Sequence, residues 1–292
     1  MIYRGIAALV LAALMPFFAL FSFGQEKKPV AASEAAKKVW QELNAGPHTV
    51  LESNHLILVV PKPFESKGKE FANEVEKHLN LASKILGFTS DSPPWEGKLL
   101  LLVLPDREKF GSFVRRLEKR SPDRDELASF VVLEGIPHLA ATQAKGKEKS
   151  LPYLEANLEI SGALLQSKAG SKTALPGWVT EGFAKAIHFR VLGPANKTVQ
   201  IEHKKAKTQV ASIQDISVVW NNPDPEKAQV LQASVMEYLA FGPHSAKLPN
   251  FLKGFSPDEN GNSPSVDQAL TAAGLSANNL LGGWKVWVVN PK

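Results

Sequence analysis

Apolar residues follow two different periods along the chain, and the balance between them changes near its middle. The stretch Lys98–Leu104 is almost wholly apolar and lies between Gly97 and Pro105, a pattern that indicates a buried strand. From Glu65 to Leu86, in contrast, apolar residues recur every three or four positions, which predicts an amphipathic helix. Residues 49–145 repeat this alternation of strand and helix, so we expect a small sheet with helices packed on it.

The other elements of the first half are predicted by the same signals. Ser53 and Asn54 separate two strand-like runs and indicate a hairpin, and residues 31–44 suggest a short helix that stops at Gly46-Pro47. The expected strands are 49–52, 55–60, 98–104, 128–133 and 138–142, and the expected helices of the sheet region are 65–86 and 106–119.

The second half is predicted to be mostly helical. Helices are expected over 151–168, 176–192, 225–241, 266–273 and 277–289. In the first of these, Leu151, Leu154, Leu158 and Leu165 share one stripe, which predicts its apolar face. Residues 198–203 and 212–217 are interpreted as short strands or loops.

Together these patterns predict the α+β class, with a small mixed β-sheet and helices in the N-terminal half and a mostly helical C-terminal half. No stretch resembles a linker between domains after residue 48. We therefore expect one compact domain over 49–292, with lobes at 49–150 and 151–292, preceded by a linker or short helix over 25–48.

The N-terminus carries a targeting signal. Met1–Arg4 is short and positively charged, residues 5–23 are almost entirely apolar, and the small residues Ser22 and Gly24 precede Gln25 at a spacing that a signal peptidase accepts. Residues 1–24 are therefore predicted to be a signal peptide or, alternatively, an uncleaved N-terminal anchor. Either interpretation predicts an exported protein, periplasmic or extracellular, or anchored in a membrane and facing outward.

Composition and charge limit the kinds of partner and of chemistry that we expect for this protein. The formal net charge is only +5, and the short basic stretches 145–149 and 203–207 contain no aromatic residues, so we expect no nucleic-acid partner. A membrane contact is expected only through the N-terminal segment, if that segment is not cleaved. The absence of cysteine excludes disulfides, thiolate metal sites and cysteine nucleophiles.

One segment carries a family resemblance. Residues 175–184 read LPGWVTEGFA, and this segment resembles a signature of the peptidase-MA-like gluzincin zinc metallopeptidases. In that family the segment opens the helix that supplies the third zinc ligand, a position that falls on Glu181. The family's His-Glu-x-x-His helix lies upstream and matches residues 158–162, which eighteen residues separate from Glu181. Weaker matches at 104–110, 232–239 and 283–287 extend the resemblance to roughly residues 49–290 and imply a gluzincin-like fold.

The resemblance also shows what is missing. The two positions where the family has zinc-binding histidines are Leu158 and Gly162, whose side chains have no atom that can coordinate a metal. Glu159 then stands at the position of the general base, and Glu181 remains alone at that of the third ligand. Leu231 also replaces a tyrosine that many relatives have. The family would bind zinc, but here we expect no intact metal site and no cofactor.

The histidines leave an alternative open. No two of the seven lie three to five residues apart, so the sequence contains no local pair of imidazole ligands. His188 lies two helical turns after Glu181 and shares its face if the helix is regular. An active enzyme with unusual ligands would need His138 or His188 to approach Glu159 or Glu181.

The two remaining glutamates and one tryptophan are the candidate functional residues. If the helices pack as in the family, Glu159 and Glu181 approach each other, and mutual repulsion would raise one pKa. The alternative is that each carboxylate faces solvent or a basic partner. Trp178 and Glu181 are candidate binding residues, although packing is the alternative role of Trp178.

The sequence therefore predicts an exported pseudo-metallopeptidase, a non-catalytic domain that binds a peptide or protein segment on a gluzincin scaffold. Two alternatives remain. One is an active metallopeptidase that hydrolyses peptides with non-standard ligands. The other is a structural or envelope-associated protein.

Overall fold

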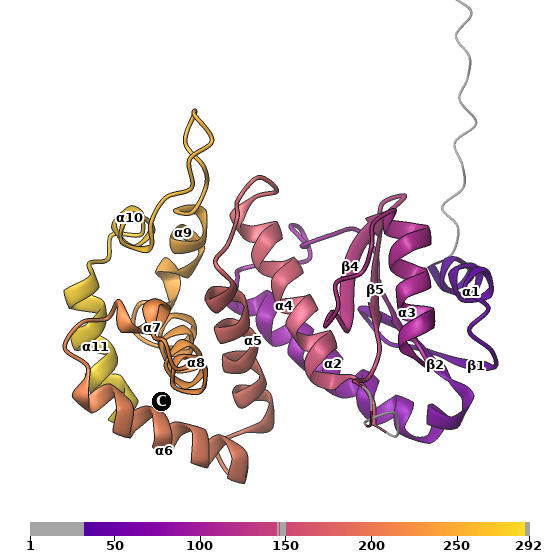
Figure 1. The fold of residues 1–292 in the computed structure, drawn as a ribbon, viewed down its shortest axis with the longest axis horizontal. Helices are drawn as coiled ribbons and strands as arrows, with labels where there is room; N and C mark the ends of the chain where they lie inside the picture. The colour runs from indigo at the N-terminus through magenta and orange to yellow at the C-terminus, as the bar shows by residue number, and fades with distance from the viewer. Residues whose placement is uncertain (1–31, 145, 147–149, 290–292) are drawn as a thin grey trace, which may run out of the picture. The chain divides into compact units, whose positions relative to one another are not determined.

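A computed structural model describes residues 32–144, 146 and 150–289 of the chain (Figure 1). The predicted signal peptide and the first residues of the predicted linker lie outside this range. The α+β prediction is confirmed, since a small mixed sheet occupies the N-terminal half and helices make up the C-terminal half. Among the described helices, none has both the length and the hydrophobicity that a membrane crossing would require.

The sheet has five strands in the order β1-β2-β3-β5-β4. The hairpin of β1 and β2 is antiparallel, β2, β3 and β5 run parallel, and β4 pairs antiparallel with β5. The strand β4 is therefore an edge strand, with no second strand beside it in the described part of the chain. The bounds are β1 His48–Glu52, β2 Leu56–Pro61, β3 Leu99–Val103, β4 Ala128–Leu133 and β5 Ile136–Ala141.

A two-residue turn sets the register of β4 against β5. Glu134 and Gly135 both have positive φ angles, 50° and 82°, as in the turns that match the twist of a hairpin. The ladder pairs Val132 with Pro137, which has no N–H to offer. Residue pairs in an antiparallel ladder alternate between hydrogen-bonded and non-hydrogen-bonded pairs, and Phe130 and Val132 belong to the second kind. Their backbone N–H and C=O groups therefore point away from β5, toward the open edge.

Both faces of the sheet are covered by helices, which explains the unbroken apolar runs of β2 and β3. Ile57 and Val59 pack with residues of α1 and α3, whereas Leu56 and Leu58 pack with residues of α2 and α4. The four helices are α1 Ala32–Glu42, α2 Glu65–Ile85, α3 Arg107–Phe113 and α4 Tyr153–Ala169, and a π-helical turn, Val114–Glu118, extends α3.

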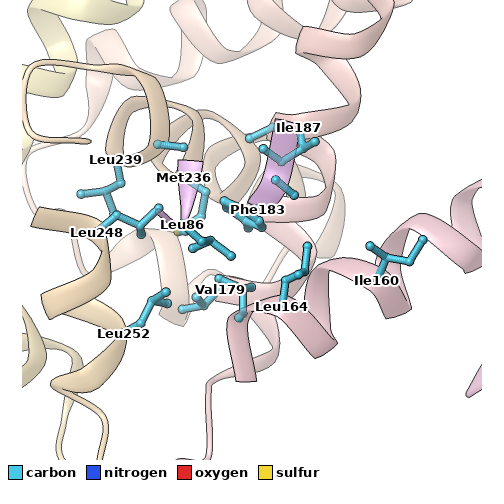
Figure 2. Close-up of a cluster of buried hydrophobic side chains, with 14 of the residues drawn as sticks. Leu86, Ile160, Leu164, Val179, Phe183, Ile187, Met236, Leu239, Leu248 and Leu252 are labelled. Carbon is cyan, nitrogen blue, oxygen red and sulfur yellow. The ribbon is translucent and has the colours of Figure 1, made fainter. Parts of the chain in front are cut away.

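The C-terminal helices pack around α5 and α8. Figure 2 shows Phe183 and Ile187 of α5 in a buried cluster with Met236 of α8 and Leu164 of α4. A Cβ atom at Gly182 would lie 2.6 Å from the carbonyl oxygen of Gln232, so this glycine allows α5 and α8 to approach closely. The bounds are α5 Gly177–Leu192, α6 Lys197–Ser212, α7 Val218–Asn221, α8 Pro225–Phe241, α9 Leu248–Lys253, α10 Val266–Ala272 and α11 Ala277–Val289.

One element was predicted wrongly. Residues 198–203, expected as a short strand or loop, belong to the helix α6. The side chain of Asn196 caps this helix by accepting a hydrogen bond from the Thr198 N–H at 2.9 Å. Buried Val199, Ala206 and Val210 show the helical period over the full length, which the local alternation of polar and apolar residues had hidden.

The predicted apolar face of α4 was wrong in part, since Leu165 of the predicted stripe is fully buried but Leu154 is not. Leu154 is 64% exposed, whereas the buried face carries Ala156, Ile160 and Leu164 together with polar Asn157 and Ser161. The helix contacts α2 and α5 as well as strands β4 and β5, so apolar residues occur around most of its circumference. The leucine stripe alone therefore did not define the buried face of α4. It also gave no sign that Asn157 and Ser161 are buried.

Candidate functional site

The helices α4 and α5 pack against each other and carry every position of the predicted site. Leu158 and Gly162 lie one turn apart on α4, and Glu181 lies in the second turn of α5. At Gly162 the helices are close, because a Cβ atom there would lie 3.3 Å from Cγ2 of Thr180. A histidine at position 162 would therefore have to displace Thr180.

Two hollows flank α4. The first, here called the edge-strand groove, has a volume of about 650 Å³ and is lined by Trp95, Phe130, Val132, Glu159, Gly162 and Thr180, among others. The second, here called the helix cavity, has a volume of about 170 Å³ and is lined by Leu154, Asn157, Leu158, Glu181, Lys185 and His188, together with Ala184. The four positions that match the zinc-site residues of the family which the sequence resembles are therefore divided, with Glu159 and Gly162 on the groove and Leu158 and Glu181 on the cavity.

The groove lies between the edge strand and the helix. Phe130 and Val132 of β4 form one wall, and Glu159 and Gly162 of α4 form part of the other. Trp95 closes one side, with its ring centroid 5.5 Å from that of Phe130. The loop that carries Trp95 is tied to α4, because the Ser167 hydroxyl donates a hydrogen bond to the backbone oxygen of Pro94 at 3.0 Å.

Glu159 has an unusual pKa. Burial raises the pKa of this carboxyl from 4.5 to about 7, and the negative charges of Glu126 and Glu118 add to the increase, while Arg120 opposes it. Glu181 is exposed and is not among the charges that shift this pKa. The structure therefore does not bring the two glutamates together as an interacting pair, and the raised pKa of Glu159 has a different origin from the one expected.

No metal cluster is found in the part of the chain that the structure describes, where no three side chains of His, Asp or Glu are grouped to hold an ion. Zinc does not fit the four positions themselves, because Leu158 and Gly162 provide no donor atom. Of the two histidines considered as substitutes, His138 uses its Nδ1 to donate to the backbone oxygen of Ile136 at 2.8 Å. His188 shares the helix cavity with Glu181, as their spacing of two turns predicted.

Trp178 packs against other aromatic rings. Its ring stacks on that of Trp220 with centroids 5.6 Å apart, and the Phe251 ring lies 6.4 Å away. Trp178 lies next to the main buried cluster and is not among the residues that line the groove or the helix cavity. Its surroundings favour the packing role over the binding role.

A buried polar cluster lies behind the helix cavity, and the sequence patterns did not reveal it. Nε2 of His78 on α2 and the hydroxyl of Ser161 share a hydrogen bond of 2.8 Å, and both residues are fully buried. Burial lowers the pKa of His78 to about 3, with a further contribution from the charge of His188. On the same helix as Ser161, the Tyr153 ring lies beside the ring of His188, with centroids 6.4 Å apart.

The signal for this cluster was present in the sequence. Tyr153, Asn157 and Ser161 recur every four residues and therefore share one helical face. A polar stripe on a helix is usually solvated, so it is informative only once the helix is known to be covered on that side. The packing of α2 on α4 provides that cover.

No protein-family model matches the chain, and no curated protein matches it.

Proposed function

We propose that this protein is an exported, non-catalytic relative of the gluzincin metallopeptidases that binds an extended peptide or protein segment in the edge-strand groove. The observation that carries the proposal is the open edge of β4 beside this groove. A volume of about 650 Å³ is in the range of ligand-binding clefts, which commonly measure about 300–1,000 Å³.

The backbone of β4 supports binding by strand addition. The N–H and C=O groups of Phe130 and Val132 face away from β5, where a peptide backbone can pair with them. An exposed strand edge is otherwise a site for uncontrolled association, which proteins usually block. Here residues of α4 and Trp95 line the groove beside this edge.

The walls of the groove support a peptide with alternating side chains. Trp95, Phe130 and Val132 provide apolar contacts, and Val132 is 52% exposed although it lies in a strand. Side chains of an extended peptide point alternately to opposite sides, so every second one would enter the groove. Glu159, with a pKa near neutrality, is positioned to donate to or accept from such a peptide.

The proposal that the protein is non-catalytic rests on coordination chemistry. In the family that the sequence resembles, two histidines and a glutamate hold zinc, which activates a water molecule. Leu158 and Gly162 stand at the histidine positions, and Glu159 and Glu181 line different hollows. Export rests on the charge and hydrophobicity pattern of residues 1–24.

The test uses a library of random dodecapeptides displayed on phage, selected on the protein without its first 24 residues. We expect extended, partly apolar peptides whose affinity falls at least about tenfold in Val132→Pro. Proline at this edge position removes the outward N–H and leaves the ladder to β5 intact. The matched control is Val132→Ala, which keeps the N–H and loses only side-chain contact. Equal binding to wild type and Val132→Pro would exclude strand addition.

A second measurement addresses the enzyme alternative. If the purified protein retains stoichiometric zinc and cleaves peptides, and Glu181→Gln abolishes both properties, then the protein is an active metallopeptidase and the non-catalytic proposal is wrong. If selection yields no peptide at all, a structural or envelope-associated role becomes the better interpretation.

A further inference from the structure

The helix cavity contains polar atoms for which the described protein provides no partner. Asn157 is only 3% exposed, and neither its Oδ1 nor its Nδ2 has a hydrogen-bond partner in the structure. Nδ1 of His188, which lines the same cavity, is also buried without a partner. A buried polar group normally has at least one partner, and leaving one unpaired destabilises the fold.

These groups line a cavity whose surface is mostly apolar. Leu154, Leu158 and Ala184 form much of the wall, and the exposed residues Leu154 and Glu181 mark the side that opens to solvent. The cavity of about 170 Å³ compares with a dry cavity of about 150 Å³ that accommodates benzene. A ligand the size of one substituted ring therefore fits.

We infer that the helix cavity is a binding site for a small uncharged amide with an apolar body, held by the side-chain amide of Asn157 and the imidazole of His188. A carboxamide offers one acceptor and two donors, so it pairs with another amide through two adjacent hydrogen bonds. His188 adds a third polar contact from α5. The apolar body of the ligand then contacts the leucines of α4.

The charges near the cavity favour an uncharged ligand over an anion. Lys185 is the cation among the lining residues, and its Nζ donates to Oε1 of Gln229 at 2.9 Å. Burial lowers the pKa of Lys185, which disfavours its charged form, while the carboxylates of Glu202 and Glu181 lie close enough to oppose this shift. An anion would lose its hydration on entering and would also meet the negative charges of Glu181 and Glu202.

This site is separate from the proposed peptide groove, because no lining residue is common to both hollows. The inference therefore stands or fails independently of the proposed function. Asn157 has no role in the groove, and Phe130 and Val132 have none in the cavity. Variants can thus be assigned to one hollow or the other.

The experiment titrates the full-length protein with benzamide by calorimetry and follows the side-chain amide resonances of Asn157 by NMR. We expect saturable binding of one benzamide, a shift of the Asn157 signals, and weaker binding of toluene and benzoate. Asn157→Leu should reduce benzamide affinity about tenfold or more. His188→Phe should reduce it by a smaller factor, and the groove variant Phe130→Ala should leave it unchanged.

The thermal stability of the same variants provides a check that folding is intact. Asn157→Leu replaces an unpaired amide with an apolar side chain of similar size. Its melting temperature should therefore be no lower than that of the wild type, and up to about 2–4 °C higher. The inference is overturned if benzamide does not bind, if toluene binds as tightly, or if Asn157→Leu binds benzamide like the wild type. The inference is also overturned if an ordered water molecule holds the side-chain amide of Asn157 and stays there when benzamide binds.

Discussion

The two sides of α4 bury ionisable groups of opposite kinds. In the edge-strand groove the pKa of Glu159 rises to about 7, whereas behind the helix cavity the pKa of His78 falls to about 3. Burial is the largest cause in both cases, because a charged group loses hydration in either place. The same physical cause, loss of hydration, therefore favours the protonated form of the carboxyl group and the unprotonated form of the imidazole.

The comparison shows that the two sides should respond to pH in opposite directions. A raised carboxyl pKa means that the folded state binds the extra proton between pH 4.5 and about 7, so stability falls as pH rises through this range. A lowered imidazole pKa means that the unfolded state binds the extra proton below pH 6.5, so stability falls as pH decreases. The protein should be most stable in weakly acidic solution.

The largest expected effect concerns the histidine side. His78→Ala should lower the free energy of unfolding by about 3 kcal/mol at pH 7, because it leaves a cavity and removes the partner of Ser161. It should also raise the stability at pH 5 relative to pH 7 by about 2 kcal/mol compared with the wild type, since the proton taken up by unfolded His78 no longer matters. Urea denaturation at several pH values measures both changes.

The control for this variant is His55→Ala, whose side chain is 58% exposed and pairs with Glu76. This substitution should cost less than about 1 kcal/mol, as exposed ion pairs usually do. If His78→Ala showed the same pH dependence of stability as the wild type, the buried imidazole would not contribute to it, and the contrast between the two sides of α4 would be lost.

The next effect concerns the carboxyl side. A carboxyl whose pKa rises to about 7 on folding reduces stability at alkaline pH by up to about 3 kcal/mol. Glu159→Gln removes this charge, so it should stabilise the protein by about 2 kcal/mol at pH 8 and have little effect at pH 5. Thermal and urea unfolding at the two pH values provide the measurement.

Glu181→Gln is the matched control, because Glu181 is exposed on the neighbouring helix. It should change stability by less than about 0.5 kcal/mol at either pH. A similar pH-dependent gain in both variants would show that the general charge of this surface, and not the burial of Glu159, is responsible.

The sequence predicted the class of fold and most elements because their apolar periods were long and their ends were marked by turn residues. The helix Pro225–Phe241, for example, begins with proline in its first turn and ends at Gly242, and its prediction is confirmed to the residue. The helix α6 was missed because its first residues alternate like a strand and only its full length shows the helical period.

The site was predictable only in part. The spacing of Glu181 and His188 correctly placed both residues on one face of α5. The relation of Glu159 to Glu181 was not predictable, because neighbouring positions on one helix can face different hollows. The buried face of α4 depends on which elements cover it, and the hydrogen-bond partner of Ser161, His78, comes from a helix distant in sequence.

The smallest expected effect concerns the contact between Gly162 of α4 and Thr180 of α5. Gly162→Ala should gain about 1 kcal/mol from helix propensity, but its Cβ would lie 3.3 Å from Cγ2 of Thr180 and lose part of this gain. Thr180→Ala removes that methyl group and makes room. A double-mutant cycle by urea denaturation should therefore give a favourable coupling of about 0.5 kcal/mol between the two substitutions.

The size of this coupling energy indicates how rigid the contact between α4 and α5 is. A favourable value means that the helices hold their distance, so that the groove and the helix cavity are separated by a fixed wall. A coupling of zero would mean that the helices move apart to admit the methyl group. The wall would then be deformable, and a peptide in the groove could alter the cavity that contains Asn157 and His188.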